Sequence, residues 1–156
     1  MENRVLVVDD EKEIREFLLK ALTRIAGFQV ELAENGEEAL KKIENQRFDL
    51  VMTDLKMPRV DGLQLIKEIS KSSPEILTVL MTGHGTIDSA IEAMKQGASD
   101  YLTKPLNLEE TILRLKKVLE EKQRFVRLKD HADQLEKANL ELKKIDAMKS
   151  EFVSVA

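Results

Sequence analysis

Five polar side chains of the sequence could act together in one chemical site, because each stands at the end of a short apolar run. They are Asp9, Asp10, Asp54, Thr82 and Lys104. Three carboxylates in one place repel one another, so either their pKa values rise or a cation lies between them. Mg²⁺ prefers oxygen ligands and is the cation we expect. A lysine and a threonine facing a metal-bound aspartate suit phosphoryl transfer, with Asp54 as the nucleophile that forms an acyl phosphate.

Each of these residues also has a simpler interpretation. Asp10 precedes a charged run and is equally suited to cap the first helix. Thr82 before Gly83 fits a turn, and Lys104 fits an exposed loop charge. Spacing alone leaves both interpretations open.

The elements that would position these side chains alternate along the sequence. Short β-branched apolar runs predict strands, and apolar residues at three- and four-residue steps predict helices between them. The strands are expected at residues 5–8, 28–33, 50–53, 76–81 and 100–103. A (βα)₅ chain of this kind forms a parallel sheet with helices on both faces. Its ligand site lies beyond the carboxyl ends of the strands, where the five polar residues would converge.

Two of the predicted helices show a clear apolar stripe. In the first helix the stripe consists of Ile14, Phe17, Leu18, Ala21, Leu22 and Ile25. In the fourth it consists of Ile87, Ala90, Ile91 and Met94. Such stripes are typical of helices that cover a sheet.

Composition limits the class of protein. With 156 residues, 42% hydrophobic and 35% charged, the chain suits one domain with a real core plus an extension. A net charge of −4 disfavours a surface that coats nucleic acid or acidic membranes, and the lack of cysteine excludes disulfides and thiolate metal sites. The first residues lack the apolar length of a secretion signal, so we expect a cytoplasmic protein without a membrane span.

The sequence contains, in order, the stretches VLVVDDEKEIR, VMTDLKMPRVDG and VLMTGHGTIDSAIEAMKQGASDYLTKP. Together they resemble the receiver domain of two-component response regulators over about residues 3 to 120. The resemblance implies a flavodoxin-like, doubly wound α/β fold with strand order 2-1-3-4-5. It also implies that an upstream histidine kinase or phosphotransfer protein donates a phosphoryl group.

The resemblance assigns roles to the acidic residues. It implies that Asp54 is the phosphoacceptor. Mg²⁺ would be bound directly by Asp10, by Asp54 and by the backbone carbonyl of Lys56. Asp9 would help to hold the metal through water.

The resemblance also implies a switch. Lys104 and Thr82 would contact the phosphoryl group, and Tyr101 would turn inward as Thr82 moves. The signal is expected to leave through residues 87–119, which span the fourth helix, the fifth strand and the start of the fifth helix. His84, in the loop after the fourth strand, is expected to tune access to the site rather than to carry chemistry.

The sequence changes character after Pro105, because all its glycines and prolines lie between Gly27 and that residue. We therefore expect a receiver domain at residues 1–122 and a coiled-coil signalling helix at 123–156. Residues recur there at alternating three- and four-residue steps, which predicts a dimer seam weakened by the polar residues His131 and Lys149. The apolar seam residues are Leu128, Leu135, Ala138, Leu142, Ile145 and Phe152. A solvated, charge-rich helix is the alternative.

Residues 146–156 resemble the lead-in to the dimerisation helix of sensor histidine kinases. We therefore expect a fragment of a larger protein in which the receiver lies upstream of a kinase core. The sequence has no histidine box and no ATP-binding domain, so the fragment is not itself expected to be a kinase. Whether it counts as an enzyme stays open, since a receiver can take up and release its own phosphoryl group.

Two other functions use a related sheet. A metal-dependent aspartyl phosphatase would carry a second acid two residues after a nucleophile on the first strand, whereas Asp9 and Asp10 are adjacent and Asp54 follows the third strand. A flavin or nucleotide binder needs a phosphate-cradling loop where the acidic run at residues 9–11 would repel phosphate unless a metal intervened. No basic recognition element follows the receiver, so no nucleic-acid partner is expected.

Overall fold

The computed structural model describes residues 3–83 and 87–155, with side chains for residues 3–83 and 88–149. His84 lies outside the described residues. The strands are β1 (Arg4–Val8), β2 (Gln29–Ala33), β3 (Leu50–Asp54), β4 (Leu77–Thr82) and β5 (Asp100–Thr103). The helices are α1 (Lys12–Arg24), α2 (Gly36–Asn45), α3 (Gly62–Ser72), α4 (Ile87–Lys95) and α5 (Leu108–Val155).

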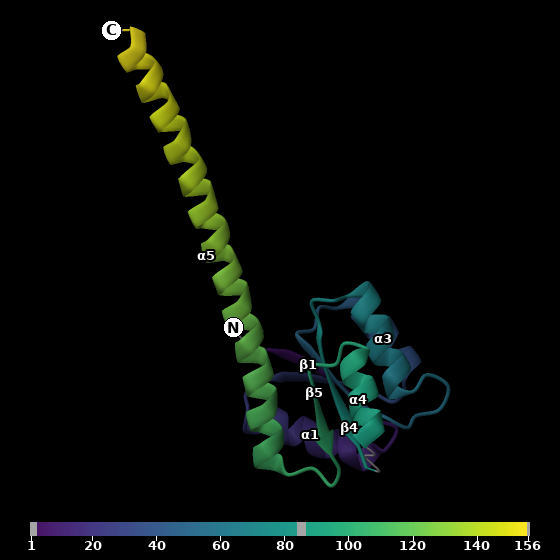
Figure 1. Cartoon of the computed structure of the whole chain (residues 1–156). Coiled ribbons are helices and arrows are strands. Elements are labelled where there is room, and N and C mark those ends of the chain that lie inside the picture. Colours follow the sequence, from purple (N-terminus) through teal and green to yellow (C-terminus); the bar gives the residue numbers. More distant parts are fainter. Residues whose placement is uncertain (1–2, 84–86, 156) are drawn as a thin grey trace. The chain divides into compact units, whose positions relative to one another are not determined.

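The strands form one parallel sheet in the order β2-β1-β3-β4-β5, so the predicted fold and strand order are confirmed. The interior strands β1 and β3 are covered on both faces, which explains their continuous apolar sequence. Val5 and Val7 pack with α1 and the start of α5, whereas Leu6 and Val8 pack with α2 and α3. Figure 1 shows α3 and α4 on one side of the sheet and α1 with the first turns of α5 on the other.

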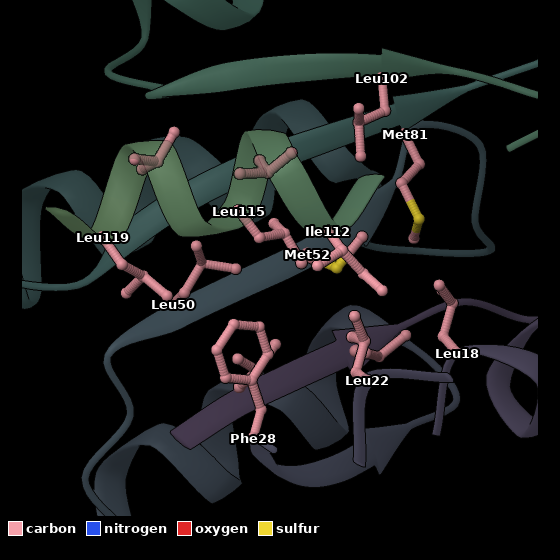
Figure 2. Packing of buried hydrophobic residues seen from close by; sticks show 14 residues of the cluster. Leu18, Leu22, Phe28, Leu50, Met52, Met81, Leu102, Ile112, Leu115 and Leu119 are labelled. Atoms are coloured by element: carbon pink, nitrogen blue, oxygen red, sulfur yellow. The ribbon is translucent and has the colours of Figure 1, made fainter. Parts of the chain in front are cut away.

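The first turns of α5 close one face of the sheet. Ile112, Leu115 and Leu119 recur at helical spacing and are buried. Figure 2 shows their side chains beside Leu50 and Met52 of β3. Burying one such aliphatic side chain contributes about 1.5–3 kcal/mol, so this stripe fixes the start of α5 on the sheet.

The apolar stripe of α1 is only partly buried. Leu18, Ala21 and Leu22 are buried, but Phe17 and Ile25 are 47% and 61% exposed. Successive helix residues turn by about 100°, which takes Phe17 out of the arc that meets the sheet. Ile25 follows the last helical residue as the C-cap.

In α4 the buried residues are the small ones. Ala90 and Ala93 are buried, and Ala93 packs in one cluster with Leu80 of β4. Ile91 and Met94 remain 48% and 47% exposed. Half of the predicted stripe of this helix is therefore left on the surface.

The chain divides into two compact units, residues 1–119 and 120–156. The second unit consists of the later turns of α5. The domain boundary predicted after residue 122 falls within that helix. Within the described ranges, no helix has the length and apolar character needed to cross a membrane.

Candidate functional site

The carboxyl ends of neighbouring strands bring the five predicted site residues to one edge of the sheet. β1 and β4 both flank β3, so Asp9 after β1, Asp54 at the end of β3 and Thr82 at the end of β4 are neighbours. Thr82 pairs in register with Thr103 of β5, and Lys104 follows directly. Residues that are far apart in the sequence thus meet at the place where ligand sites lie in such sheets.

Three aspartates form the acidic part of the site. Carboxylate oxygens of Asp9, Asp10 and Asp54 lie within 4.8 Å of one another. Asp9 and Asp54 are buried and Asp10 is exposed, so the group opens to solvent through Asp10. Oxygen donors gathered at this spacing suit a hard cation such as Mg²⁺. The residues present therefore fit the metal that the sequence predicted.

Lys104 places a positive charge between two of these carboxylates. Its Nζ donates a 2.9 Å hydrogen bond to Oδ2 of Asp9 and lies 3.2 Å from Oδ1 of Asp54. Only 15% of the side chain is exposed, so the alternative of an exposed loop charge is wrong. Burial works to lower the pKa of the ammonium, but Asp9 and Asp54 outweigh burial and raise this pKa above its ordinary value.

The Asp54 carboxyl has a raised pKa. Burial is the main cause, and the negative charge of Asp9 adds to it. Lys104 and the N–H of Leu55, which donates to Oδ1 of Asp54 at 2.9 Å, lower the pKa without reversing the shift. One ammonium therefore does not balance the carboxylates at this edge of the sheet.

A cavity of about 290 Å³ lies at the site. Its lining includes Asp10, Asp54, Lys56, Thr82 and Lys104. Thr82 is buried, and its Oγ1 has no hydrogen-bond partner among the described residues. An unsatisfied buried hydroxyl costs about 1–3 kcal/mol. A bound anion in the cavity is one group that could accept a hydrogen bond from it.

The predicted switch residue Tyr101 lies apart from this cavity. It belongs to β5 and is 39% exposed. With Ala90, Ile91, Met94 and Lys95 of α4, it lines a separate groove of about 420 Å³. Its ring therefore belongs to the surface between α4 and β5.

Arg15 also supports the site, and sequence reasoning missed it. Its Nη1 donates to the backbone carbonyl of Asp9 at 2.7 Å, and its side chain is 11% exposed. Oδ1 of Asp9 accepts a 2.9 Å hydrogen bond from the N–H of Glu11. Because Glu11 is the N-cap of α1, the alternative in which Asp10 caps this helix is wrong. The only sequence signal for Arg15 is its place in the first helix, five residues after Asp10.

The loop between β3 and α3, residues 55–61, is tied at its ends. The N–H of Gly62 donates to the carbonyl of Leu55 at 2.9 Å. A Cβ on Gly62 would lie 2.2 Å from the carbonyl oxygen of Asp54, so position 62 accepts only glycine without movement. The glycine of the VMTDLKMPRVDG stretch thus allows α3 to begin against the backbone of Asp54.

The predicted dimer seam lies in the second unit. Its members Leu128, Leu135, Ala138, Leu142 and Ile145 are all exposed in the single chain. The side chain of Phe152 lies outside the described residues. Pairing of two such helices stays a prediction.

Comparison with known proteins gives one matching family and several relatives. A family model for the response regulator receiver domain matches residues 5–116. The chain is 43% identical over 115 residues to the transcriptional regulatory protein ZraR of Klebsiella oxytoca, with 74% of this chain and 26% of that protein covered. It is 38% identical over 116 residues to the response regulator MprA of Mycobacterium sp. (strain KMS), with 74% and 50% covered. The chain thus spans half or less of the length of these relatives.

Solved structures agree with the fold. A CheY-like response regulator receiver domain protein from Methanospirillum hungatei JF-1 has a TM-score of 0.75 and 30% identity, with 80% of this chain and 98% of that chain covered. NtrX from Brucella abortus has a TM-score of 0.78 and 34% identity, with 83% and 29% covered. The aspartyl phosphatase alternative gains no support from these comparisons. ZraR is named as a transcriptional regulatory protein, and this name does not support the expectation that the chain has no nucleic-acid partner.

Proposed function

Because the chain belongs to the response regulator receiver domain family, we propose that it is the phosphoacceptor of a two-component phosphorelay and that Asp54 is the residue modified. A phosphohistidine on an upstream histidine kinase or phosphotransfer protein would be the donor. The observation that carries the proposal is the position of the Lys104 ammonium, 3.2 Å from Asp54 in a group of carboxylates whose negative charge it does not balance.

Mg²⁺ would be held by Asp10, Asp54 and the backbone carbonyl of Lys56, with Asp9 contributing through water. The three converging carboxylates and the raised pKa of Asp54 support this assignment. When bound, the metal would neutralise negative charge on the carboxylates and on the phosphoryl oxygens.

The transfer exchanges one bond to phosphorus for another. A carboxylate oxygen of Asp54 attacks the phosphorus, the P–N bond to the donor histidine breaks, and the electron pair stays on the imidazole nitrogen. Lys104 would hold one phosphoryl oxygen through its ammonium. Thr82 would donate its hydroxyl, which has no partner among the described residues, to another oxygen. We propose that Thr82 moves toward the phosphoryl group to make this hydrogen bond, and that its movement lets Tyr101 turn inward.

The phosphorylation state would leave the domain through α4, β5 and the start of α5. Tyr101 lines the groove beside α4, so its movement would reshape an apolar surface. Arg114 of α5 donates to the carbonyl of Tyr101 at 3.1 Å and pairs with Asp100 at 3.1 Å. A shift of β5 would therefore be passed to α5 directly.

The later turns of α5 are proposed to form a homodimer. A single helix in water is marginally stable, and the exposed apolar seam gains most when a second copy covers it. His131 and Lys149 within the seam would lower the stability of the pair and help to fix its register.

Beyond the tail, we propose that the parent protein carries a histidine kinase core, on the likeness of residues 146–156 to the lead-in of a kinase dimerisation helix. A transcriptional output is the second candidate, and the names of the relatives favour it. In either case we propose that the receiver works in the cytoplasm, where ATP is available to form the phosphohistidine donor.

The phosphoacceptor assignment is tested by incubating the chain with Mg²⁺ and acetyl phosphate and measuring the intact mass. We expect one added phosphoryl group, which disappears in Asp54→Asn and when the metal is omitted. Asp88→Asn, on the first turn of α4, is the matched control and should still be modified. Undiminished modification of Asp54→Asn would exclude the assignment.

The dimer is tested by sedimentation. Leu135→Lys, at a seam position that is 53% exposed, should give a monomer. Leu140→Lys is the matched control, because Leu140 is 54% exposed but lies outside the seam. Truncation after Gln123 should also give a monomer. The seam is wrong if the two lysine variants have the same oligomeric state.

A further inference from the structure

The start of α2 touches the loop between β3 and α3 at one unusually close point. Gly36, the first residue of α2, is buried against Val60. A Cβ at position 36 would lie 2.7 Å from both Cβ and Cγ1 of Val60 and 3.0 Å from its carbonyl oxygen. Non-bonded carbon atoms rest about 3.5–4.0 Å apart. Any side chain at position 36 must therefore displace either Val60 or the helix.

From this contact we infer that the first turn of α2 positions residues 55–61, and with them the Lys56 carbonyl that is proposed to bind Mg²⁺. Gly36 and Val60 are then positioning residues for the metal site, although neither lines its cavity. The inference rests on the metal site of the proposed function.

The part of the chain that directly follows Val60 has little freedom to move. At its C-terminal end, the capping box between Asp61 and Gln64 fixes the start of α3. Gly62, the first residue of α3, lies against the backbone of Asp54. Met57 is buried in the hydrophobic cluster on which Val60 packs. A displacement of Val60 would therefore spread along the loop toward Lys56.

The helix is the more rigid of the two partners. The side chain of Asn35 caps α2 by accepting a 2.9 Å hydrogen bond from the N–H of Glu38. The carboxylate of Glu38 accepts one in return from the N–H of Glu34 at 3.1 Å. The loop, by contrast, already holds Arg59 at a φ of 68°, a left-handed conformation that is unfavourable for a residue other than glycine. A steric conflict at position 36 is thus relieved mainly by the loop.

The expected effect is on metal affinity. Loss of a group that orients a metal ligand typically weakens metal binding by about 10–100-fold. Since Gly36 acts on a backbone carbonyl through several residues, we expect Gly36→Ala to weaken Mg²⁺ binding by about tenfold.

The test is an NMR titration of the full chain with Mg²⁺, following the backbone amides of the loop. Four variants are compared with the wild type: Gly36→Ala, Val60→Gly, the double variant, and Ile43→Val. Ile43 is the matched control, because it lies on the same helix and packs on the same cluster about two turns away. We expect Gly36→Ala and Val60→Gly each to weaken binding and Ile43→Val to leave it unchanged. Gly36→Ala should add a smaller loss in the Val60→Gly background than in the wild type, because only the carbonyl oxygen of residue 60 then remains close.

The outcomes separate this inference from the proposed function. If the wild type does not bind Mg²⁺, the proposed metal site is wrong. If the wild type binds Mg²⁺ and folded Gly36→Ala binds it equally well, the positioning role is wrong. Should Gly36→Ala not fold by circular dichroism, Val60→Gly decides: weaker binding than in Ile43→Val supports the inference, and equal binding overturns it.

Discussion

Replacing Lys104 with methionine isolates what its charge does for the folded domain. Methionine keeps most of the side-chain length and removes the ammonium that lies 2.9 Å from Asp9 and 3.2 Å from Asp54. Asp9 is fully buried, so the variant leaves a carboxylate without its lysine partner in a region of low dielectric constant. We expect the free energy of unfolding to fall.

Two opposing contributions set the magnitude. The gross Coulomb attraction across the 2.9 Å contact is about 6 kcal/mol at an effective dielectric constant of about 20. Burial of the ammonium costs free energy in the wild type, and this cost by itself lowers the pKa of Lys104. The variant avoids that cost, which offsets part of the lost attraction. Removing one partner of a buried ion pair typically costs about 3–5 kcal/mol. Because the lysine is 15% exposed, we expect the lower end of that range, about 3 kcal/mol.

Urea unfolding of both proteins at one fixed protein concentration, in metal-free buffer at neutral pH, measures the difference. Lys12→Met is the matched control: Lys12 pairs with Glu16 at 3.8 Å and is 76% exposed, so its loss should change the free energy of unfolding by less than about 1 kcal/mol. The cost of Lys104→Met should shrink on adding Mg²⁺ and in acid, where Asp54 takes up a proton. A Lys104→Met protein as stable as the wild type at neutral pH would refute the reasoning.

Three further variants test single features of the site and of α2 by urea unfolding. The pKa of Asp54 is raised above its ordinary value of 3.8, so ionising this group lowers stability as the pH rises through the raised pKa. Asp54→Asn should therefore be more stable than the metal-free wild type at neutral pH, with the difference vanishing in acid; a less stable variant at neutral pH would contradict this. Thr82→Val removes the unsatisfied hydroxyl and should raise the free energy of unfolding by about 1 kcal/mol, whereas a loss would mean that the hydroxyl has a partner. Asn35→Ala removes the cap that accepts from the N–H of Glu38 and should cost about 1 kcal/mol, and no change would mean that the cap is not stabilising.

The carboxyl-end residues could be predicted from the sequence because parallel strands are directional. Once β1, β3 and β4 are recognised as buried strands, the residues at their ends must share one edge of the sheet, whatever lies between them. The proximity of Asp9, Asp54 and Thr82 follows from strand order, which the alternating pattern and the family resemblance supplied.

Other contacts have no such periodic signal. The hydrogen bond from Arg15 to the Asp9 carbonyl depends on where a long, flexible side chain comes to rest. The approach of Gly36 to Val60 depends on how α2 packs beside a loop, and the exposure of Phe17 depends on how wide an arc of α1 meets the sheet. These features depend on packing geometry, which cannot be read from the periodicity of apolar residues in the sequence.

The distribution of charge around Asp54 gives the proposed switch a direction. On the β1 side stand the carboxylates of Asp9 and Asp10, which repel a phosphoryl group. The hydroxyl and the ammonium that attract one belong to Thr82, the last residue of β4, and to Lys104, which follows β5 on the other side of β3. A phosphoryl group on Asp54 would therefore favour a state in which the ends of β4 and β5 move closer to it. The size of the shift is set by how much better the phosphoryl group interacts with that state than with the unmoved one. In the proposed switch, this asymmetry would direct the signal to the face of α4, β5 and α5 rather than to β2, at the opposite edge of the sheet.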